Sequence, residues 1–292
     1  MRRGRYYLGR VVKVNLDQQS LMDAIANSPI VNIGKFDWAI TDIEDNRNED
    51  IPYIFGKVSN YAKNGHAKVI DEVKRSQVEA DVPNLLEASS PFVYLPDCSG
   101  IAFLHVWNGI QEDVFPRRFK SIIEAAFDNF FVACDVEPIT DYRAFTSRLK
   151  KLSQFTEFSA TVYPPNPLFG RLWGNLNEYI GNRNATEVTV KEQTSKPDGL
   201  KSKLIELMDR IMESPSFELE EVPAVGDAAI LMAADGYGRG KVIGIEQGEE
   251  VIIKTSDTQK SFLHSKEPIP SELTLKAKSQ FDKVTKERDM QH

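Results

Sequence analysis

Apolar and polar residues alternate along several short stretches of the first half of the chain, as they do in half-buried β-strands. A first strand is predicted over Arg5–Asn15. A short amphipathic helix is predicted over Asp17–Ala26, because Asp17 is a good N-cap and apolar residues recur at helical spacing. Asn64-Gly65 is a typical turn pair and predicts a hairpin. Further strands are predicted over residues 36–44, 51–58, 66–73, 92–95 and 101–107.

Helical periodicity is stronger in the rest of the chain. Pro116 is expected to begin a helix through RRFKSIIEAAFDNFF, since apolar residues recur every three or four positions as far as Phe130. Polar residues from Lys266 onward predict a tail or a terminal helix. Other helices are predicted over residues 141–151, 168–180 and 200–212, and other strands over 135–139, 155–163 and 187–191. Short apolar runs predict an antiparallel meander over residues 228–233, 240–245 and 251–255.

Strands and helices are mixed without regular β-α repetition. This order favours an α+β protein with mixed, mainly antiparallel sheets and flanking helices. A chain of 292 residues is long enough for two cores. We therefore expect an N-terminal α+β lobe over residues 1–150 and a C-terminal α+β lobe over residues 151–292. The second lobe is expected to contain the meander, near residues 226–256, and to end in a polar C-terminal tail.

The composition is that of an ordinary globular protein, with 41% hydrophobic and 27% charged residues. Its two cysteines, Cys98 and Cys134, lie beside apolar runs, so buried free thiols in a reducing compartment are expected. No apolar run reaches the roughly 18 residues of a membrane span. The N-terminal stretch is broken by Gly9, Arg10 and Lys13, unlike a signal peptide. A cytoplasmic protein without membrane insertion is expected.

The sequence contains none of the common catalytic signatures: no G-x-S-x-G elbow, Walker A loop, dinucleotide fingerprint or kinase motif. Its four histidines have no metal-ligand spacing to another His, Cys or carboxylate. DGYGRG at Asp235–Gly240 resembles a glycine-rich phosphate loop, but such a loop opens a helix, and a strand is predicted to follow here. A hairpin turn is therefore expected at this segment, and no catalytic residue or cofactor is assigned.

A metal-dependent nuclease is an alternative interpretation of the first predicted hairpin. Asp42 and Glu44 lie two residues apart on a predicted strand and so point to one face, and Lys57 lies on the next strand. Carboxylates arranged in this way can hold Mg²⁺. Asp45 and Glu49 crowd the same region, however, which is typical of an acidic hairpin tip.

The net charge of −7 argues against a nucleic-acid footprint over the whole surface, so a phosphate-binding surface must be a local patch. Tyr6, Tyr7 and Phe119 lie among basic residues and could stack on bases. Arginines at the start of a helix are disfavoured by the helix dipole, and a bound phosphate would relieve that cost. The residues expected to bind nucleic acid are Arg2, Arg3, Arg5, Arg117, Arg118, Lys120 and Arg148.

Several segments resemble the family of the phage-exclusion protein RexA of lambdoid prophages. They are the hairpin FDWAITDIE…IPYIFGKVSNYAKNG, the stretch VPNLLEASSPFVYLPDCSGIAFLHV before the arginine-bearing helix, the turns YPPNPLFGRLW and KPDGL, and AADGYGRG. The resemblance covers most of the chain. It implies a two-lobed α+β homodimer that binds DNA with little sequence specificity. It also implies a role in anti-phage defence, as phage exclusion or abortive infection, beside a second effector protein encoded nearby.

The leading hypothesis is therefore a non-enzymatic sensor or regulator of phage defence that engages nucleic acid, DNA favoured, through a local basic surface. One alternative is a metal-dependent nuclease of a defence system that uses Asp42, Glu44 and Lys57 with Mg²⁺. Another is a protein-interaction adaptor or toxin partner in a two-gene defence system, whose acidic surface meets a protein.

Overall fold

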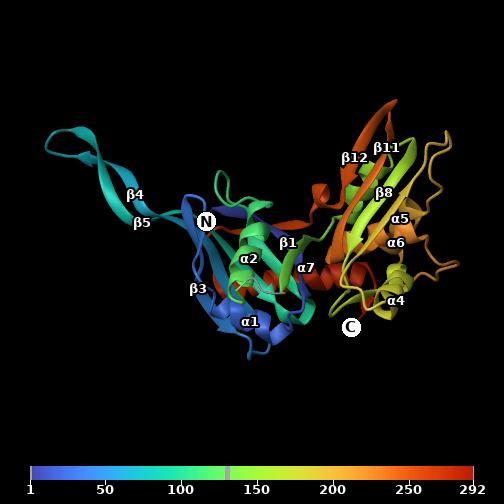
Figure 1. The fold of residues 1–292 in the computed structure, drawn as a ribbon, viewed down its shortest axis with the longest axis horizontal. Helices are drawn as coiled ribbons and strands as arrows, with labels where there is room; N and C mark the ends of the chain where they lie inside the picture. Colours follow the sequence, from blue (N-terminus) through green and yellow to red (C-terminus); the bar gives the residue numbers. More distant parts are fainter. Residues whose placement is uncertain (1, 129–131, 292) are drawn as a thin grey trace.

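The computed structural model describes residues 2–128 and 132–291 of the chain. It has two lobes, each built on its own antiparallel sheet with flanking helices, and a two-stranded arm projects from one of them (Figure 1). The α+β class expected from the sequence is confirmed. The lobe around the eight-stranded sheet is called the first lobe, and the lobe around the four-stranded sheet is called the second lobe.

The sheet of the first lobe has the strand order β13-β1-β6-β5-β4-β3-β2, and β7 also pairs with β1. Every pairing in it is antiparallel, from β1·β13 at one edge to β2·β3 at the other. The strands are β1 Arg3–Val14, β2 Val31–Ile33, β3 Phe36–Asn46, β4 Tyr53–Asp71, β5 Ser76–Leu95, β6 Gly100–Leu104, β7 Ala133–Pro138 and β13 Ser261–Ser265.

Helices cover both faces of this sheet. On one face lie α1 (Gln18–Ala26) and α2 (Val114–Ala125), whose apolar side chains form one core with the sheet. In that core the ring of Phe115 on α2 stacks on Phe103 of β6, with 4.2 Å between ring centroids. Helix α2 ends before the predicted stretch does, and the residues around Phe130 lie outside the described part of the chain.

The opposite face of the sheet is covered by the C-terminal helix α7 (Pro270–Glu287). Leu273, Ala277, Phe281 and Val284 recur at helical spacing, are buried, and pack against the sheet. The predicted polar tail is therefore an amphipathic helix of the first lobe. Strand β13, just before it, pairs with β1, so the end of the chain returns to the sheet with which the chain began.

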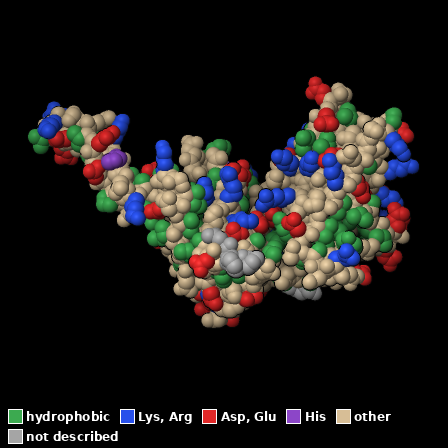
Figure 2. All heavy atoms as spheres, viewed as in Figure 1, with side chains coloured by type: hydrophobic (Ala, Val, Ile, Leu, Met, Phe, Trp, Pro, Cys, Tyr) green, Lys and Arg blue, Asp and Glu red, His purple; other side chains and the backbone are tan. Residues whose placement is uncertain are grey.

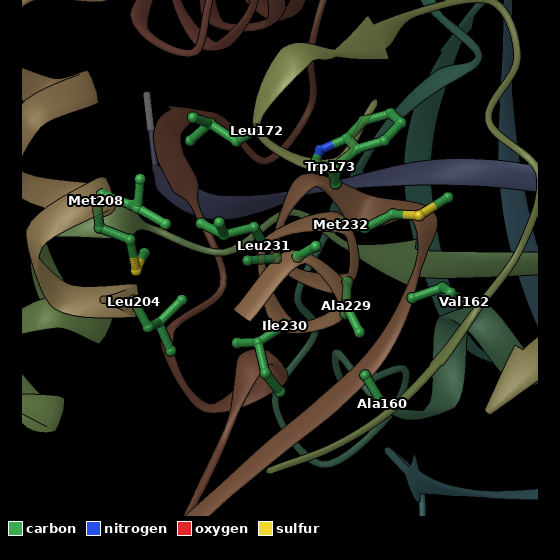
Figure 3. Packing of buried hydrophobic residues seen from close by; sticks show 14 of the residues in the cluster. Ala160, Val162, Leu172, Trp173, Leu204, Met208, Ala229, Ile230, Leu231 and Met232 are labelled. Atoms are coloured by element: carbon green, nitrogen blue, oxygen red, sulfur yellow. The ribbon is translucent and has the colours of Figure 1, made fainter. Parts of the chain in front are cut away.

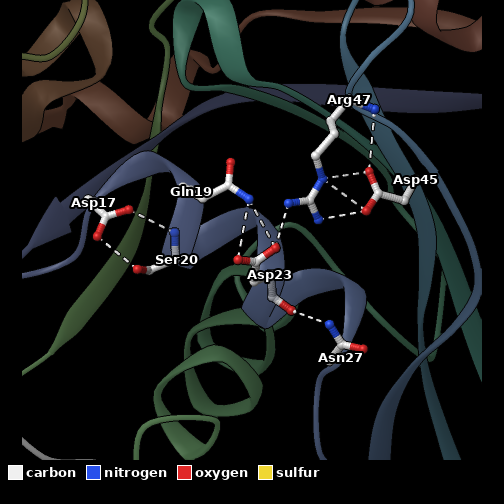
Figure 4. A network of polar contacts seen from close by, with 7 residues as sticks. All are labelled: Asp17, Gln19, Ser20, Asp23, Asn27, Asp45 and Arg47. Carbon is white, nitrogen blue, oxygen red and sulfur yellow. Dashed lines mark hydrogen bonds and ion pairs between the residues drawn. The ribbon is translucent and has the colours of Figure 1, made fainter.

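Helix α1 is fixed at its start and along its side by carboxylates (Figure 4). The Asp17 side chain accepts a hydrogen bond from the Ser20 amide at 2.8 Å, as the sequence predicted for an N-cap. Asp23 on α1 and Asp45 on β3 both pair with Arg47, and this ion pair lowers the pKa of Asp45. The Arg47 guanidinium thus connects the helix to the β3–β4 hairpin.

The arm is the far part of the β4–β5 hairpin, and it corrects one prediction. Gly65 does not lie in a turn: it is inside β4 and pairs with Val82, and the strands continue to the pair Asp71 and Ser76. A Cβ atom at Gly65 would collide with the Leu85 side chain across the ribbon, so the glycine is required by close packing. The arm therefore extends beyond the sheet into solvent (Figure 1).

The sheet of the second lobe has the order β10-β8-β11-β12. Helices pack on one of its faces only, around α6, whose apolar side chains from Ala228 to Met232 are buried on all sides (Figure 3). The strands are β8 Gln154–Val162, β10 Val188–Gln193, β11 Gly238–Glu246 and β12 Glu249–Lys254. The helices are α3 Tyr142–Leu149, α4 Gly174–Asn182, α5 Leu204–Glu213 and α6 Val225–Met232.

Two predictions for this lobe were wrong. Residues 228–233, expected to be the first strand of the meander, belong to helix α6 and the turn after it. The run AAILMAA is apolar throughout because the helix is central, so it carries no period that separates helix from strand. The segment Asp235–Gly240 is not a hairpin tip but the junction from this helix to β11, where Gly236 and Gly238 adopt positive φ. Strands β11 and β12 form the hairpin that was predicted.

A buried polar cluster joins the two lobes at this junction. The Asp235 carboxylate accepts hydrogen bonds at 2.7 Å from Tyr142 Oη, Trp173 Nε1 and Arg288 Nη1. The backbone oxygen of Asp235 accepts from Arg10 Nε on β1 at 2.9 Å. Asp235 and Arg288 are each 3% exposed, so this is a buried ion pair with hydrogen-bond partners from both lobes.

Both cysteines are free thiols, as expected, and burial raises the pKa of Cys98 to about 11. Among the described helices, none combines the length and the apolar character needed to cross a membrane.

Candidate nucleic-acid interface

Between the two lobes lies a hollow of about 930 Å³ whose walls come from both sheets. Figure 2 shows Lys and Arg side chains on both sides of this hollow, with carboxylates between them at its floor. The basic residues that line it are Arg5, Arg117, Arg239, Lys241 and Lys254.

The wall of the second lobe is the open face of its sheet. On β11, Arg239 and Lys241 point into the hollow. Val242, the next residue along the strand, points to the other face and is buried against the helices. The register places Thr161 of β8 beside Arg239, and Lys254 of β12 beside Lys241. Alternation along each strand thus produces one apolar face and one open face, which carries hydroxyl, cationic and carboxylate groups beside the hollow and Ile243 and Ile252 farther along the strands.

The wall of the first lobe comes from β1 and the start of α2. Arg5 and Tyr7 lie two residues apart on β1 and line the hollow. The Arg5 guanidinium donates to Ser261 Oγ at 2.9 Å, so it is held along the edge of the sheet. On α2, Arg117 pairs with Asp113 at 2.7 Å and remains 67% exposed.

Carboxylates position most of these cations. Glu137 is completely buried at the floor and accepts from Arg239 Nε at 2.9 Å. Burial raises the pKa of Glu137, and the ion pair with Arg239 offsets part of that shift. Glu157 pairs with Lys241 at 2.8 Å and with Lys191 at 3.1 Å, and the hydrogen bond from Lys241 lowers its pKa.

The charge of the hollow is therefore close to balanced, with a small excess of cations. Within the described residues, Arg5 and Lys254 form no ion pair with a carboxylate. These two lie on opposite walls. A bound anion would contact cations from both walls. Arg5 and Lys254 could bind it without breaking an ion pair to a carboxylate.

The structure brings together some of the residues predicted to bind nucleic acid. Arg5 and Arg117 line the hollow. Arg148 lies at its border, because it pairs at 3.1 Å with Asp257, a residue of the lining. Lys120 is half-buried and pairs with Asp135 at 2.8 Å.

The remaining predicted residues do not line the hollow. The Arg118 guanidinium lies over the ring of Trp38 at 4.8 Å, and burial lowers its pKa. Arg2 and Arg3 are exposed at the start of β1, beside Ser265 of β13. Of the three predicted arginines at the N-terminus, Arg2, Arg3 and Arg5, only Arg5 therefore lines the hollow.

Sequence reasoning missed three basic residues of the second-lobe wall: Arg239, Lys241 and Lys254. The signal for two of them was the period of two in RGKV, which places Arg239 and Lys241 on one face of a strand. It was overlooked because the prediction assigned the glycines of this segment to a turn.

The residues of the nuclease alternative are only partly assembled. Lys57 Nζ lies 2.8 Å from the Asp42 carboxylate, and both line a shallow hollow of about 850 Å³ on the first lobe. A bulge between Thr41 and Glu44 changes the register of β3, and Glu44 is not part of that lining. Within the described residues, no group of three or more His, Cys, Asp and Glu side chains is close enough to hold a metal ion. The Mg²⁺ site stays a prediction.

No protein-family model matches this chain, and no curated protein matches it significantly.

Proposed function

We propose that this protein is a non-enzymatic nucleic-acid-binding protein, with DNA the favoured ligand. The sugar-phosphate backbone of the nucleic acid is proposed to lie in the hollow between the lobes. The observation that supports the proposal most is the meeting of cations from both lobes, Arg5 and Arg117 on one side and Lys241 and Lys254 on the other. Lysine and arginine heads with neighbouring hydroxyl groups are the usual partners of phosphate oxygens. Glycine-rich loops and helix N-termini are not needed for such contacts.

Binding of this kind depends on phosphates and carries little sequence information. With a net charge of −7, a surface that binds a polyanion has to be a local cluster of cations, and the hollow contains such a cluster. The carboxylates at the floor fix the cations and also reduce the local positive potential. We therefore expect moderate affinity that decreases steeply with salt concentration.

The biological part of the proposal comes from the resemblance to the RexA family. We propose a sensor or regulator of anti-phage defence that acts as a homodimer beside a second effector protein. Light scattering combined with mass determination tests the dimer, and co-purification with the product of a neighbouring gene tests the effector.

The binding test is a fluorescence-anisotropy titration of a labelled 20-bp duplex at several salt concentrations. Wild type is compared with Lys241→Ala/Lys254→Ala, and with Lys283→Ala/Lys286→Ala on the exposed face of α7 as the control matched in charge. Removing two phosphate contacts should lower the slope of log affinity against log salt by about 2, and the control should keep the wild-type slope.

Two results would overturn the proposal. One is the absence of binding by wild type at low salt, with duplex and single strand alike. The other is equal affinity and equal salt dependence for Lys241→Ala/Lys254→Ala and the Lys283→Ala/Lys286→Ala control, which would place any nucleic acid elsewhere on the surface.

A further inference from the structure

Trp107 is the most exposed aromatic side chain of the described residues, at 77%. The other two tryptophans of the chain, Trp38 and Trp173, are 4% and 1% exposed and belong to the cores. From Gly100 to Ala125, all of which the structure describes, Trp107 is the one large apolar side chain left in solvent. A single indole on a polar surface offers a flat face, not an apolar patch wide enough for a protein partner.

The loop that carries Trp107 is held in place by hydrogen bonds at both ends. The His105 amide donates to the Arg5 carbonyl at 2.9 Å, which continues the β1–β6 ladder by one residue. The Val106 amide donates to Ile110, and the Gly109 amide donates back to Val106. Ile110 is completely buried and anchors the loop in the core. The loop backbone that carries the indole is thus held in place before any ligand arrives.

Aromatic contacts connect Trp107 to the hollow. The indole rests on the edge of the His105 ring, with 4.8 Å between centroids, and His105 contacts Tyr7 at 6.0 Å in the same T-shaped geometry. His105 Nδ1 also lies 2.6 Å from the Glu112 carboxylate. Tyr7 and Glu112 both line the hollow, so Trp107 stands beside the first-lobe wall that carries Arg5.

We infer that Trp107 is a stacking platform for an unpaired base of a nucleic-acid strand whose phosphates lie in the hollow. The inference rests on the proposed function and makes a strand with unpaired bases the preferred ligand over a duplex. Inside a duplex, both faces of every base are covered by neighbouring bases, whereas an unpaired base can turn an open face toward the indole. Cations for the backbone beside an aromatic ring for the base are the usual combination in single-strand recognition.

Tryptophan fluorescence tests this inference directly, because the two other tryptophans are buried. Wild type is titrated with a 12-nucleotide oligothymidine and with the 20-bp duplex. Stacking of a thymine on Trp107 should quench the long-wavelength part of the emission with the single strand, and the duplex should quench it much less.

Affinities of two variants provide the second readout. Trp107→Ala should bind the oligothymidine about 10–100-fold more weakly than wild type. Its duplex affinity should stay within about twofold of wild type, because the backbone contacts in the hollow are unchanged. Trp107→Phe, which keeps an aromatic face, should retain most of the single-strand affinity. Since the side chain is exposed, circular dichroism and the Tm of both variants should match wild type, and this checks that they fold.

The two proposals fail in different ways. If wild type binds neither DNA, the proposed function fails, and this inference fails with it. If wild type binds both DNAs but Trp107→Ala binds the oligothymidine as well as wild type does, only the stacking platform is overturned. Two results together support both proposals. Lys241→Ala/Lys254→Ala should lose binding to both DNAs, and the preference of wild type for the single strand should disappear in Trp107→Ala.

Discussion

The sheets of the two lobes differ in how many of their faces are covered. In the first lobe, α1 and α2 cover one face and α7 covers the other, and all five residues of β6 are buried. In the second lobe, helices cover one face, and β8 alternates between half-buried and buried residues along its second half. When a strand is buried on both faces, its side chains are all used for packing. When one face is open, every second side chain along the strand is available to contact a ligand.

The first prediction concerns the junction at which the two regions meet. Asp235→Ala should destabilise the protein by about 5 kcal/mol, because it leaves the buried Arg288 guanidinium unpaired and removes the acceptor of Tyr142 and Trp173. Urea unfolding followed by tryptophan fluorescence measures this. Asp282→Ala, which removes the exposed ion pair with Lys278 on α7, is the control and should cost less than about 1 kcal/mol. A loss below about 1 kcal/mol for Asp235→Ala would show that the cluster does not hold the lobes together.

The second prediction tests the contrast between covered and open faces. Phe103→Ala should cost about 3–4 kcal/mol, because Phe103 is completely buried and stacks on Phe115. Thr161→Ala on the open face should change the free energy of unfolding by less than about 0.5 kcal/mol, since its hydroxyl contacts only the exposed Thr189. Similar losses in the two variants would mean that the second sheet is not an open surface.

The third prediction uses the pKa of Glu137. In the folded protein its pKa is raised above 4.5 by burial, and Arg239 offsets part of the shift. Arg239→Gln should raise that pKa further. A carboxyl whose pKa is raised by folding contributes stability at low pH that is lost as the pH rises through the folded-state pKa.

Arg239→Gln should therefore be close to wild type near pH 4.5 and lose about 1–3 kcal/mol relative to it by pH 8. Thermal unfolding at a series of pH values checks the sign. The double variant Glu137→Gln/Arg239→Gln should show no such pH dependence. A deficit of Arg239→Gln that grows toward acid would contradict the assignment.

The smallest effect is expected from the arm. Replacing residues 66–81 by Asn-Gly would join the paired Gly65 and Val82 through a two-residue turn. Because the removed side chains pack on neither lobe, the free energy of unfolding should change by less than about 1 kcal/mol. Denaturant unfolding checks this, and a large loss would show that the arm supports the first lobe.

Local signals in the sequence predicted the elements that depend on local chemistry. Asp17 and the helix that follows were identified from capping and periodicity, and the structure confirms both. The length of the arm could not be predicted, because Gly65 serves close packing between strands and not a turn. Helix α6 was missed since burial on every side removes the period from its sequence.

For the candidate site too, residues with a local signal in the sequence could be predicted and residues placed by tertiary structure could not. Arg5 and Arg117 were recognised from clusters along the chain, and both line the hollow. Lys254 lies more than one hundred residues from either and reaches the hollow only through its pairing with β11. Residues that are brought together by sheet register have no signature in a single sequence.

The way the chain passes between the lobes has a mechanical consequence. Two crossing segments lie side by side: Thr140 pairs with Gln259, and the Lys260 amide donates to Ile139 at 2.7 Å. At its end the chain crosses again, where Met290 pairs with Gly170. A single linker would act as a hinge, but three connections around a buried ion pair resist both bending and twisting. The two walls of the hollow are therefore held in place without a ligand, so under the proposed function little binding free energy would be spent on moving them together. If the protein binds nucleic acid as proposed, small-angle scattering should give the same radius of gyration for the protein alone and for the protein in the complex, once the nucleic acid is contrast-matched.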